Sequence, residues 1–412
     1  MKKTLLSLAL MATTGTAMAN GFDNGRLGGM GGAGYATGNY ADGVLLNPSL
    51  GSAHGEKDDF ALVINVGALG QDEDKLLDGL EDLADYLDLL ENRTASQWGG
   101  MIDPNNPEGS ARELLAEEAD EVEARLRNID NRNANINAGA SFVVAIPNDW
   151  MSVSLVGKTR IDAAVTTLVD DGDFAYIRGA VGEENFDASG LQSRAIGRGA
   201  AVSEVGLALS KSLATGEDSQ LLVGATPKWM HVMTFVYTAT VEEFDEDDFD
   251  GDDYTVESDD FNLDLGATYL SGNMRYALTV SNLISNEYDT IVPGETIEIE
   301  PRATAALGYR NDWLTAEVAS DLTTSKNFTT GQDTRFVRAG LELDLANWVQ
   351  LRAGMRQDLE DNEPDQVSVG LGFSPFGVVN LDIAVFGEDF GSLGEYEDAT
   401  TGGASVQLGL RF

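Results

Sequence analysis

The sequence predicts an all-β fold, an antiparallel transmembrane β-barrel of about 14 strands. Three observations support this prediction: the pattern of the last strand, an even number of strand-like segments, and the lengths of the connections. Successive side chains of a strand point to opposite faces. In the last eight residues one face carries Val406, Leu408, Leu410 and Phe412, and the other carries Gln407, Gly409 and Arg411. An alternating strand with an aromatic carboxy-terminus is typical of the closing strand of an outer-membrane barrel.

Fourteen segments of the chain show strand-like composition or alternation, and bacterial barrels built from one chain have an even number of strands. The segments lie near residues 58–69, 134–147, 150–164, 200–212, 219–243, 255–270, 273–284, 299–310, 312–322, 333–344, 347–358, 365–373, 377–387 and 401–412.

The connections between these segments alternate in length. Short turns such as Pro147–Asp149 and Ser271–Asn273 are followed by longer, mostly acidic segments. The longer segments are 70–133, 165–199, 244–254, 285–298, 323–332, 359–364 and 388–400. This alternation predicts short turns at one end of a barrel and long loops at the other, as in outer-membrane proteins.

The amino-terminus has the pattern of an export signal. A basic start at Met1–Lys3 is followed by a short apolar run and by Ala17-Met18-Ala19, so residues 1–19 are expected to be a cleaved signal peptide. No later segment has the roughly 20 apolar residues of a membrane helix. A soluble exported protein and a barrel in the outer membrane both fit the signal, and the connection pattern favours the barrel.

The composition limits the partners and the chemistry. The net charge of −43 argues against nucleic acid or anionic phospholipid as a partner. The absence of cysteine excludes disulfides and thiol chemistry. The two histidines, His54 and His231, belong to no G-x-S-x-G or H-E-x-x-H motif, so we expect no enzyme activity.

Charged residues within the carboxy-terminal strands should point into the barrel, because a charge facing the middle of the bilayer costs about 2–4 kcal/mol. The residues expected to line the lumen are Glu317, Asp321, Arg338, Glu342, Arg352 and Arg356. They would form either a structural network of paired charges or part of a path for a substrate.

Residues 72–131 interrupt the strand pattern. Leucines from Leu76 to Leu90, and apolar residues from Leu115 to Ile129, recur at alternating spacings of four and three. This spacing predicts an antiparallel helical hairpin with a turn at Pro104–Pro107 and a capping box of Ser110 with Glu113. The hairpin would be extracellular or would fold into the lumen. It would be either a self-packed insertion or a docking surface for a partner protein.

Two loop motifs suggest ligands. Glu246, Asp248, Asp250 and Glu257 match ligand positions of a calcium-binding loop, although the flanks read as strands. We therefore predict either weak Ca²⁺ binding or a solvated acidic loop, and no other cofactor. The glycines of 29–34 match a dinucleotide fingerprint, but no strand precedes them, so the match is discounted.

The amino-terminal segment resembles the start of barrels related to the long-chain fatty-acid transporter FadL. The resemblance is carried by Gly25–Ala36 and by Ala41–Ser49, where Asn47-Pro48-Ser49 departs from the family's Asn-Pro-Ala. It implies a 14-stranded barrel plugged near its amino-terminus, here by residues 20–57. The barrel itself would then be 58–412, with Asn47-Pro48 marking a turn in the plug.

The carboxy-terminal half is similar to the conjugal transfer protein TraF-like family of barrels. Val280–Ile284, Pro301–Ala303, Leu351–Arg356 and Gly370–Gly377 carry the similarity. The two resemblances imply a protein in contact with outer-membrane lipid and with the barrel assembly machinery, which would recognise Phe412. They also imply passage of small hydrophobic molecules. The alternative is a non-transporting surface or conjugation-associated protein that docks through its hairpin.

Overall fold

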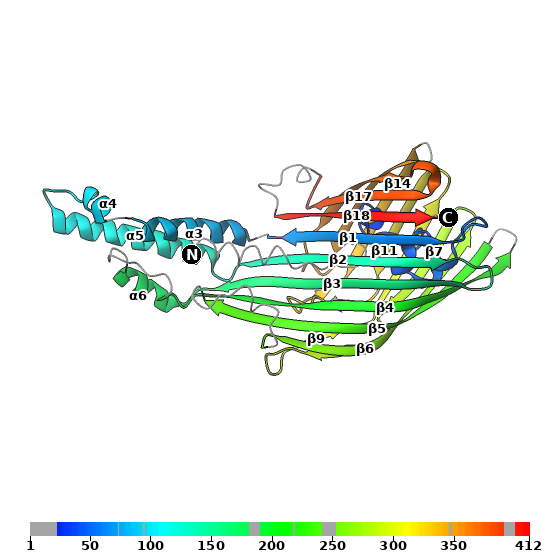
Figure 1. The fold of residues 1–412 in the computed structure, drawn as a ribbon, viewed down its shortest axis with the longest axis horizontal. Helices are drawn as coiled ribbons and strands as arrows, with labels where there is room; N and C mark the ends of the chain where they lie inside the picture. The colour runs from blue at the N-terminus through cyan, green and yellow to red at the C-terminus, as the bar shows by residue number, and fades with distance from the viewer. Residues whose placement is uncertain are drawn as a thin grey trace.

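The computed structural model describes residues 23–72, 74–93, 95–180, 190–216, 219–240, 253–345, 348–390 and 400–412. The predicted signal peptide 1–19 lies outside these residues. Figure 1 shows a barrel with helices beyond one of its ends and the carboxy-terminus near the other.

The described strands form a closed antiparallel barrel of fourteen, which confirms the predicted fold class. Neighbours along the chain pair with each other, and β1 pairs with β18 to close the ring. The strands are β1 (Ala61–Gln71), β2 (Asn133–Ile146), β3 (Ser152–Leu168), β4 (Arg194–Gly216), β5 (Ser219–Thr240), β6 (Thr255–Ser271), β7 (Met274–Ser281), β10 (Arg302–Arg310), β11 (Leu314–Asp321), β14 (Phe336–Leu345), β15 (Val349–Asp358), β16 (Gln366–Phe373), β17 (Val379–Gly387) and β18 (Thr401–Arg411).

The closing seam runs from Ala61 opposite Arg411 to Gln71 opposite Thr401, without a register shift. Beyond the last ladder pair, the amides of Asp59 and Phe60 donate to the carbonyl oxygen of Phe412, at 2.7 and 3.2 Å. The carboxy-terminal residue is therefore held to the strand that begins the barrel.

Side chains alternate between the inside and the outside of the barrel as the sequence predicted. On β18, Ser405 and Gln407 are buried whereas Val406 and Leu408 are exposed on the outer face. The outer face of the other strands is apolar too, and its exposed residues include Leu278, Leu307, Val318, Leu341, Met355, Leu371 and Ile383. An apolar outer surface on a closed barrel matches the hydrocarbon layer of a membrane.

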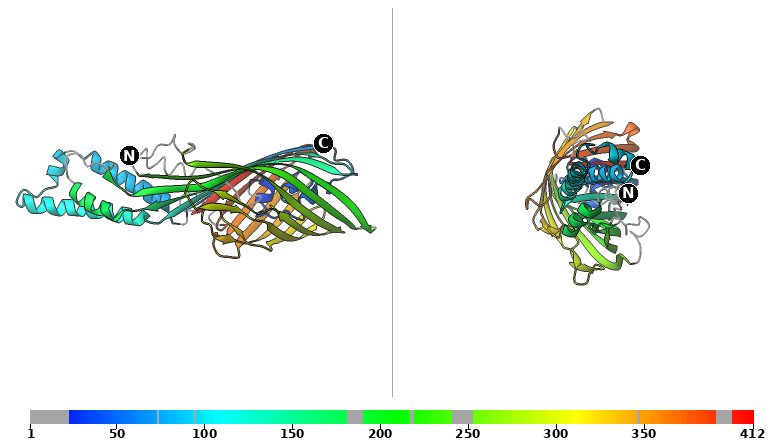
Figure 2. Two further views of the ribbon diagram at one scale, coloured as in Figure 1. Left: turned by 90° about the horizontal axis from the view of Figure 1, so that it is seen from below. Right: turned by 90° about the vertical axis from the view of Figure 1, so that its left-hand side faces the viewer.

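The wall of the barrel is much taller on one side. Strands β7, β10, β11 and β14 to β17 have 8 to 10 residues, about the length that crosses a bilayer. Strands β4 and β5 have 23 and 22 residues, which corresponds to roughly 70 Å or more of extended chain. Figures 1 and 2 show these long strands reaching past the short ones toward the helices.

Two small hairpins lie between barrel strands and were not predicted. They are β8 (Asn286–Asp289) with β9 (Thr296–Ile299), and β12 (Ser325–Lys326) with β13 (Asp333–Thr334). Tyr288 and Ile299 of the first hairpin pack against Val202 and Met230 of the long strands. Val202 and Met230 point inward, so this hairpin folds over the lumen.

The insertion after β1 forms helices α3 (Leu76–Glu91), α4 (Ala95–Gly100) and α5 (Pro107–Ile129), which confirms the helical hairpin. The expected capping box is wrong, because the helix starts earlier, at Pro107. Asn106 caps it by accepting from the amide of Gly109, whereas the hydroxyl of Ser110 donates to the carbonyl of Asn106 within the first turn.

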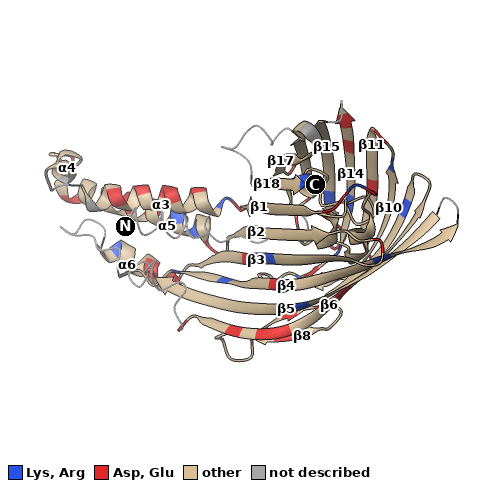
Figure 3. Ribbon diagram, turned by 45° about the vertical axis from the view of Figure 1, so that its right-hand side comes forward, with Lys and Arg blue, Asp and Glu red and all other residues tan. Residues whose placement is uncertain are grey.

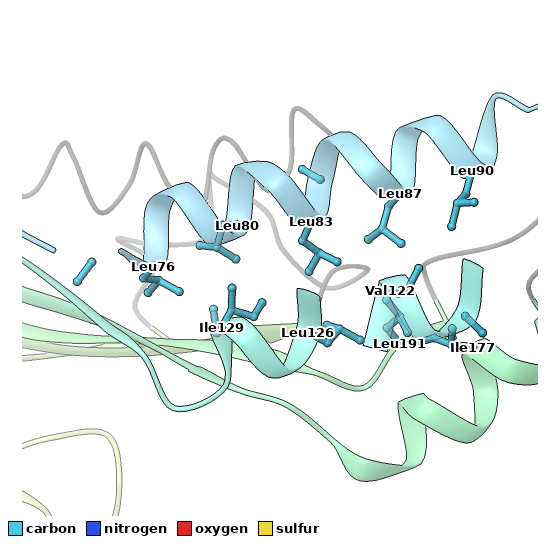
Figure 4. Packing of buried hydrophobic residues seen from close by; sticks show 14 residues of the cluster. Leu76, Leu80, Leu83, Leu87, Leu90, Val122, Leu126, Ile129, Ile177 and Leu191 are labelled. Atoms are coloured by element: carbon cyan, nitrogen blue, oxygen red, sulfur yellow. The ribbon is translucent and has the colours of Figure 1, made fainter. Parts of the chain in front are cut away.

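A further helix, α6 (Asp171–Ala180), packs beside the hairpin and was expected to be loop. Leucines of α3 face apolar residues of α5, and Ile177 and Leu191 complete the same core (Figure 4). We call α3, α5 and α6 the helical arm. In the described part of the chain, no helix is long and apolar enough to span a membrane.

Residues 23–57, which we call the plug, lie within the ring of strands. The plug contains one short α-helix and two 3-10 helices: α2 (Gly25–Gly28), η1 (Gly43–Leu45) and η2 (Pro48–Ser52). Nearly all of its residues up to Ser52 are buried, including the side chains of Arg26, Asp42 and Asn47. The buried charges of the plug must therefore find partners within the plug or on the barrel wall.

Candidate functional site

The polar contacts between the plug and the inner wall define the candidate site. Asn24 caps helix α2 by accepting from the amides of Arg26 and Leu27, at 3.0 and 2.9 Å, and so places Arg26 against β14. Arg26 Nε and Nη2 donate to Glu342 Oε2 and Oε1 at 2.8 and 3.0 Å, and Nη1 lies 3.3 Å from Asp42 Oδ1. A two-point pair of this kind is strong and fixes the orientation of both groups.

The network continues along the wall. Arg352 Nε lies 2.6 Å from Glu342 Oε2, and Arg352 Nη1 lies 2.8 Å from Asp382 Oδ1. Glu342 therefore stands between one arginine of the plug and one of β15. All four of these side chains are almost fully removed from solvent, so removal of any partner leaves an unmatched buried charge.

Glu317 on β11 holds a second part of the plug. Its carboxylate accepts from the backbone amides of four consecutive residues, 34–37, at 2.7 to 3.1 Å, and from the hydroxyl of Thr37 at 2.8 Å. Consecutive amides that converge on one point form a concave binding site for an anion. Here the anion is a side chain of the barrel itself.

Asp321 and Arg338 form a pair on the wall. Arg338 Nη1 and Nη2 lie 2.9 and 3.2 Å from the two carboxylate oxygens of Asp321. Asp321 Oδ2 also accepts from the amide of Phe336 at 3.1 Å, and Arg338 lies 5.7 Å from the ring centroid of Tyr35 in the plug. This pair supports the wall and contacts the plug through the ring.

The Asn47-Pro48 turn contacts another part of the wall, at β6. The side-chain amide of Asn47 donates to the backbone carbonyl of Tyr35 at 2.7 Å and to the hydroxyl of Thr268 at 2.8 Å. The side-chain oxygen of Asn47 accepts from the backbone amide and the hydroxyl of Ser49, at 3.1 and 2.7 Å, and so caps the start of helix η2. The Ser49 hydroxyl lies 2.8 Å from that of Thr268, so the departure from Asn-Pro-Ala adds a polar contact.

Glycines on both surfaces allow the backbone of the plug to touch the wall. Gly31 has a φ of +68°, and a Cβ added there would lie 2.6 Å from the backbone of Met355. A Cβ added to Gly354, on the adjacent strand position, would collide with the backbone of residues 30 and 31. Side chains at these positions would push the plug away from the wall.

Of the six residues expected to line the lumen, all are buried, and the structure brings most of them into two networks. Glu317 and Glu342 contact the plug directly, and Arg352 reaches it through Glu342. Arg356 lies apart, 4.4 Å from the ring centroid of Phe336.

Sequence reasoning missed a third group of lumenal charges. Lys228 Nζ lies 3.1 Å from Glu204 Oε2 and 3.0 Å from Asp264 Oδ1, and Lys158 Nζ lies 3.6 Å from the same oxygen of Glu204. These charges also lie within apolar strands, so the rule that predicts lumenal side chains in the carboxy-terminal strands applies equally to β3 to β6.

Two cavities lie in the lumen and its mouth. The inner cavity, of about 70 Å³, is lined from β3, β10 and β15 and from both small hairpins; its charged residues are Arg160, Asp162, Glu298, Glu300, Arg302, Lys326, Arg356 and Glu363. The outer cavity, of about 380 Å³, is lined mainly by amide, hydroxyl and charged side chains. Glu363 lines both cavities, so the two are neighbours.

The possible calcium loop cannot be built from the described residues, because Glu246, Asp248 and Asp250 lie outside them. Glu257 is on β6, 4.0 Å from His231 Nε2. His231 points outward, stacks on Trp229 and lies 2.8 Å from Asp259 Oδ1. Within the described ranges, no three acidic or histidine side chains are grouped to hold a metal ion.

A closed barrel with an apolar outer face and a lumen filled by its own amino-terminal segment is a plugged barrel of the outer-membrane type. The chain belongs to the family described as "F plasmid transfer operon, TraF, protein", whose model matches residues 44–321. No curated protein matches the chain at a significant level.

Solved structures of other proteins also resemble the chain. The TodX deltaS2S3 mutant monoaromatic hydrocarbon channel is 11% identical with a TM-score of 0.49, and the match covers 94% of this chain and 97% of that one. A Pseudomonas aeruginosa FadL homologue is 11% identical with a TM-score of 0.49, covering 97% and 99%. At this sequence identity and TM-score, the likeness gives no information about a solute of this chain.

Proposed function

We propose that the protein is a plugged outer-membrane channel for small molecules, in which residues 23–57 act as the gate. The observation that carries this proposal is the bidentate contact of Arg26 with Glu342. It joins the plug to a wall that closes independently through the β1–β18 seam. The plug can therefore move without opening the ring of strands.

The grip of the wall on the plug is concentrated in a few polar side chains. Glu342, Glu317 and Thr268 each hold a different part of the plug. Each contact lies in a dry environment, where a charged hydrogen bond is strong but costly to leave unmatched. A solute or another protein that displaced the plug from one of these side chains would release one part of the plug at a time.

The cavities bear on the kind of solute. Their linings are rich in charged, amide and hydroxyl side chains, which favour a small polar solute. Passage of a small hydrophobic molecule, expected from the resemblance to fatty-acid transporters, stays a prediction. Uptake into vesicles of one polar and one apolar probe of similar size would decide between the two.

The gate is tested by conductance in planar bilayers. We expect deletion of residues 24–50, with the export signal retained, to raise single-channel conductance well above that of the full chain. The matched control shortens the helical arm and leaves the plug intact, and it should not change conductance. Equal conductance of the deletion and the full chain would contradict a gating plug.

The helical arm supports a second candidate function, docking of another protein. The arm has its own apolar core and projects beyond the rim at the end opposite the short turns (Figures 1 and 4). Short turns of outer-membrane barrels face the periplasm, so the arm would face the cell exterior. Acidic positions recur along α3 and α5 (Figure 3), which favours a partner with a basic surface.

Docking is tested by replacing residues 76–129 with a short glycine-serine linker. The barrel should still fold, because its seam does not involve the arm. Loss of a mating phenotype with unchanged conductance would support docking, whereas changed conductance with an intact mating phenotype would contradict it.

A further inference from the structure

The inner cavity holds two oppositely charged side chains that do not touch each other. Arg160 and Asp162 are two residues apart on β3, so both point to the lumen and both line the cavity. Neighbouring side chains on one face of a strand are roughly 7 Å apart. The structure records no ion pair within 4 Å between these two residues, so they interact only at longer range.

Arg160 has a free guanidinium edge. Within the described part of the chain it makes no hydrogen bond or ion pair, and its Nε is buried without a partner. Its guanidinium lies over the ring of Phe328, 4.6 Å from the centroid, which fixes the plane of the group. The N–H groups of Arg160 are thus held in a fixed orientation without a hydrogen-bond acceptor among the described residues.

Arg302, from β10 on another part of the wall, lines the same cavity. Its hydrogen bonds go to the hydroxyl of Ser325, and among the described residues no carboxylate lies within 4 Å of it. Its guanidinium is 5.9 Å from the ring centroid of Phe336. Two arginines from different strands therefore face one small space, and neither forms a direct ion pair among the described residues.

Some acidic residues of the cavity are held by neighbouring groups, whereas Asp162 and Glu298 have no side-chain hydrogen bond or ion pair among the described residues. Glu363 accepts from the side-chain amides of Gln71 and Asn327, and Glu300 accepts from the backbone amide of Lys326 at 3.2 Å. These two carboxylates hold the loops that cover the cavity. Asp162, in contrast, has no hydrogen-bond or ion-pair partner among the residues that the structure describes.

Arg160, Asp162 and Arg302 are each half-buried, and a ligand of complementary charge can complete groups that lack a direct ion-pair partner. We propose that the inner cavity is a binding site for a small zwitterion of the amino-acid type. The ligand's carboxylate would lie between Arg160 and Arg302, and its ammonium group would face Asp162. A simple anion would leave Asp162 unmatched, and a simple cation would leave the arginines unmatched.

The size of the cavity limits the ligand. A volume of about 70 Å³ exceeds the roughly 10–15 Å³ that one water molecule needs, but it is small for a ligand. Glycine and alanine, the smallest amino acids, are therefore the natural probes. The proposal rests on the proposed channel function, since it names the class of solute, but binding can be measured without transport.

The test is equilibrium binding of radiolabelled glycine to the full-length protein in detergent. We expect saturable binding that unlabelled alanine displaces, and displacement by acetate or methylammonium that is about tenfold weaker or more. Arg160→Gln and Asp162→Asn should each weaken glycine binding about tenfold or more. The matched control is Arg198→Gln, which removes an arginine that lines only the outer cavity and should leave binding unchanged.

The displacement of glycine by alanine, acetate and methylammonium needs no variant, so it tests the zwitterion site even if one substitution prevents folding. Absence of saturable binding, or acetate displacing glycine as well as alanine does, would overturn the zwitterion site. Unchanged binding in Asp162→Asn would overturn it too. If binding fails while deletion of the plug still raises conductance, only this inference falls. If binding holds and that deletion has no effect, only the gate falls.

Discussion

Arg26 and Glu342 are 316 residues apart in sequence and form two parallel hydrogen bonds, of 2.8 and 3.0 Å, across the boundary between plug and wall. Glu342 also accepts from Arg352 at 2.6 Å. One carboxylate thus pairs with one arginine of the plug and one of the barrel. Glu342 is thus a partner shared by the plug and the wall, so its loss affects both.

Glu342→Gln should loosen the amino-terminal part of the plug. The amide keeps the shape of the side chain but leaves Arg26 and Arg352 with less compensation, and breaking a buried pair typically costs about 3–5 kcal/mol. Hydrogen exchange at residues 24–33 should accelerate, and conductance should rise. Asp344→Asn, on the same strand and without an ion pair among the described residues, is the control and should change neither.

Glu317→Gln should affect a different part of the plug. An amide has one acceptor oxygen, so it cannot accept from all of the N–H groups at residues 34–37, and each buried donor left unmatched costs about 1–3 kcal/mol. Faster exchange should be confined to residues 34–37, and Glu317→Ala should accelerate it further. Acceleration spread evenly over the whole plug would contradict separate attachment points.

Gly31→Ala should displace the plug from β15. The substitution adds a Cβ 2.6 Å from the backbone of Met355, at a residue with positive φ where a side chain costs roughly 1–2 kcal/mol. The thermal midpoint should fall and conductance should rise. Gly402→Ala on β18 is the matched control, since its added Cβ meets no atom within 4 Å. Equal effects of the two substitutions would argue against close packing at Gly31.

Acid should weaken the contact between α5 and α6 in the helical arm. Hydrogen bonds from Arg127 and Arg178 lower the pKa of Glu123 below its usual value. The carboxylate therefore stabilises the arm above the ordinary glutamate pKa of about 4.3, and this contribution is lost as the pH falls through the lowered pKa. Exchange of α6 should accelerate in that range, and Glu123→Gln should remove most of this pH dependence.

Much of the fold could be predicted because alternation and turn lengths are local properties of a sequence. The fourteen barrel strands and the hairpin of α3 with α5 repeat their patterns over many residues. Helix α6 was missed because its ten residues include two glycines and because Ile177 is buried only by the distant hairpin. The four-residue strands β8 and β9 are too short to show a period.

The site was predictable only in part. Burial of Glu317 and Glu342 follows from their place inside apolar strands, since neither can face lipid. Their partners could not be identified from residue types, because Glu317 binds backbone amides and Glu342 binds an arginine at the other end of the sequence. The chain's contacts across the lumen depend on how the plug is folded, and no short pattern encodes that.

The central claim is that the plug must move for the channel to conduct, and a reversible cross-link tests it most directly. The chain has no cysteine, and the Cβ of Ala36 lies 3.4 Å from the position of a Cβ added to Gly308, close to the spacing of a disulfide. The pair Ala36→Cys and Gly308→Cys would be combined with Glu342→Gln, and with Thr37→Ser to remove a nearby methyl group. We predict low conductance when the pair is oxidised and a return to high conductance on reduction. Equal conductance in both states, with the cross-link verified on a gel, would contradict the gating account.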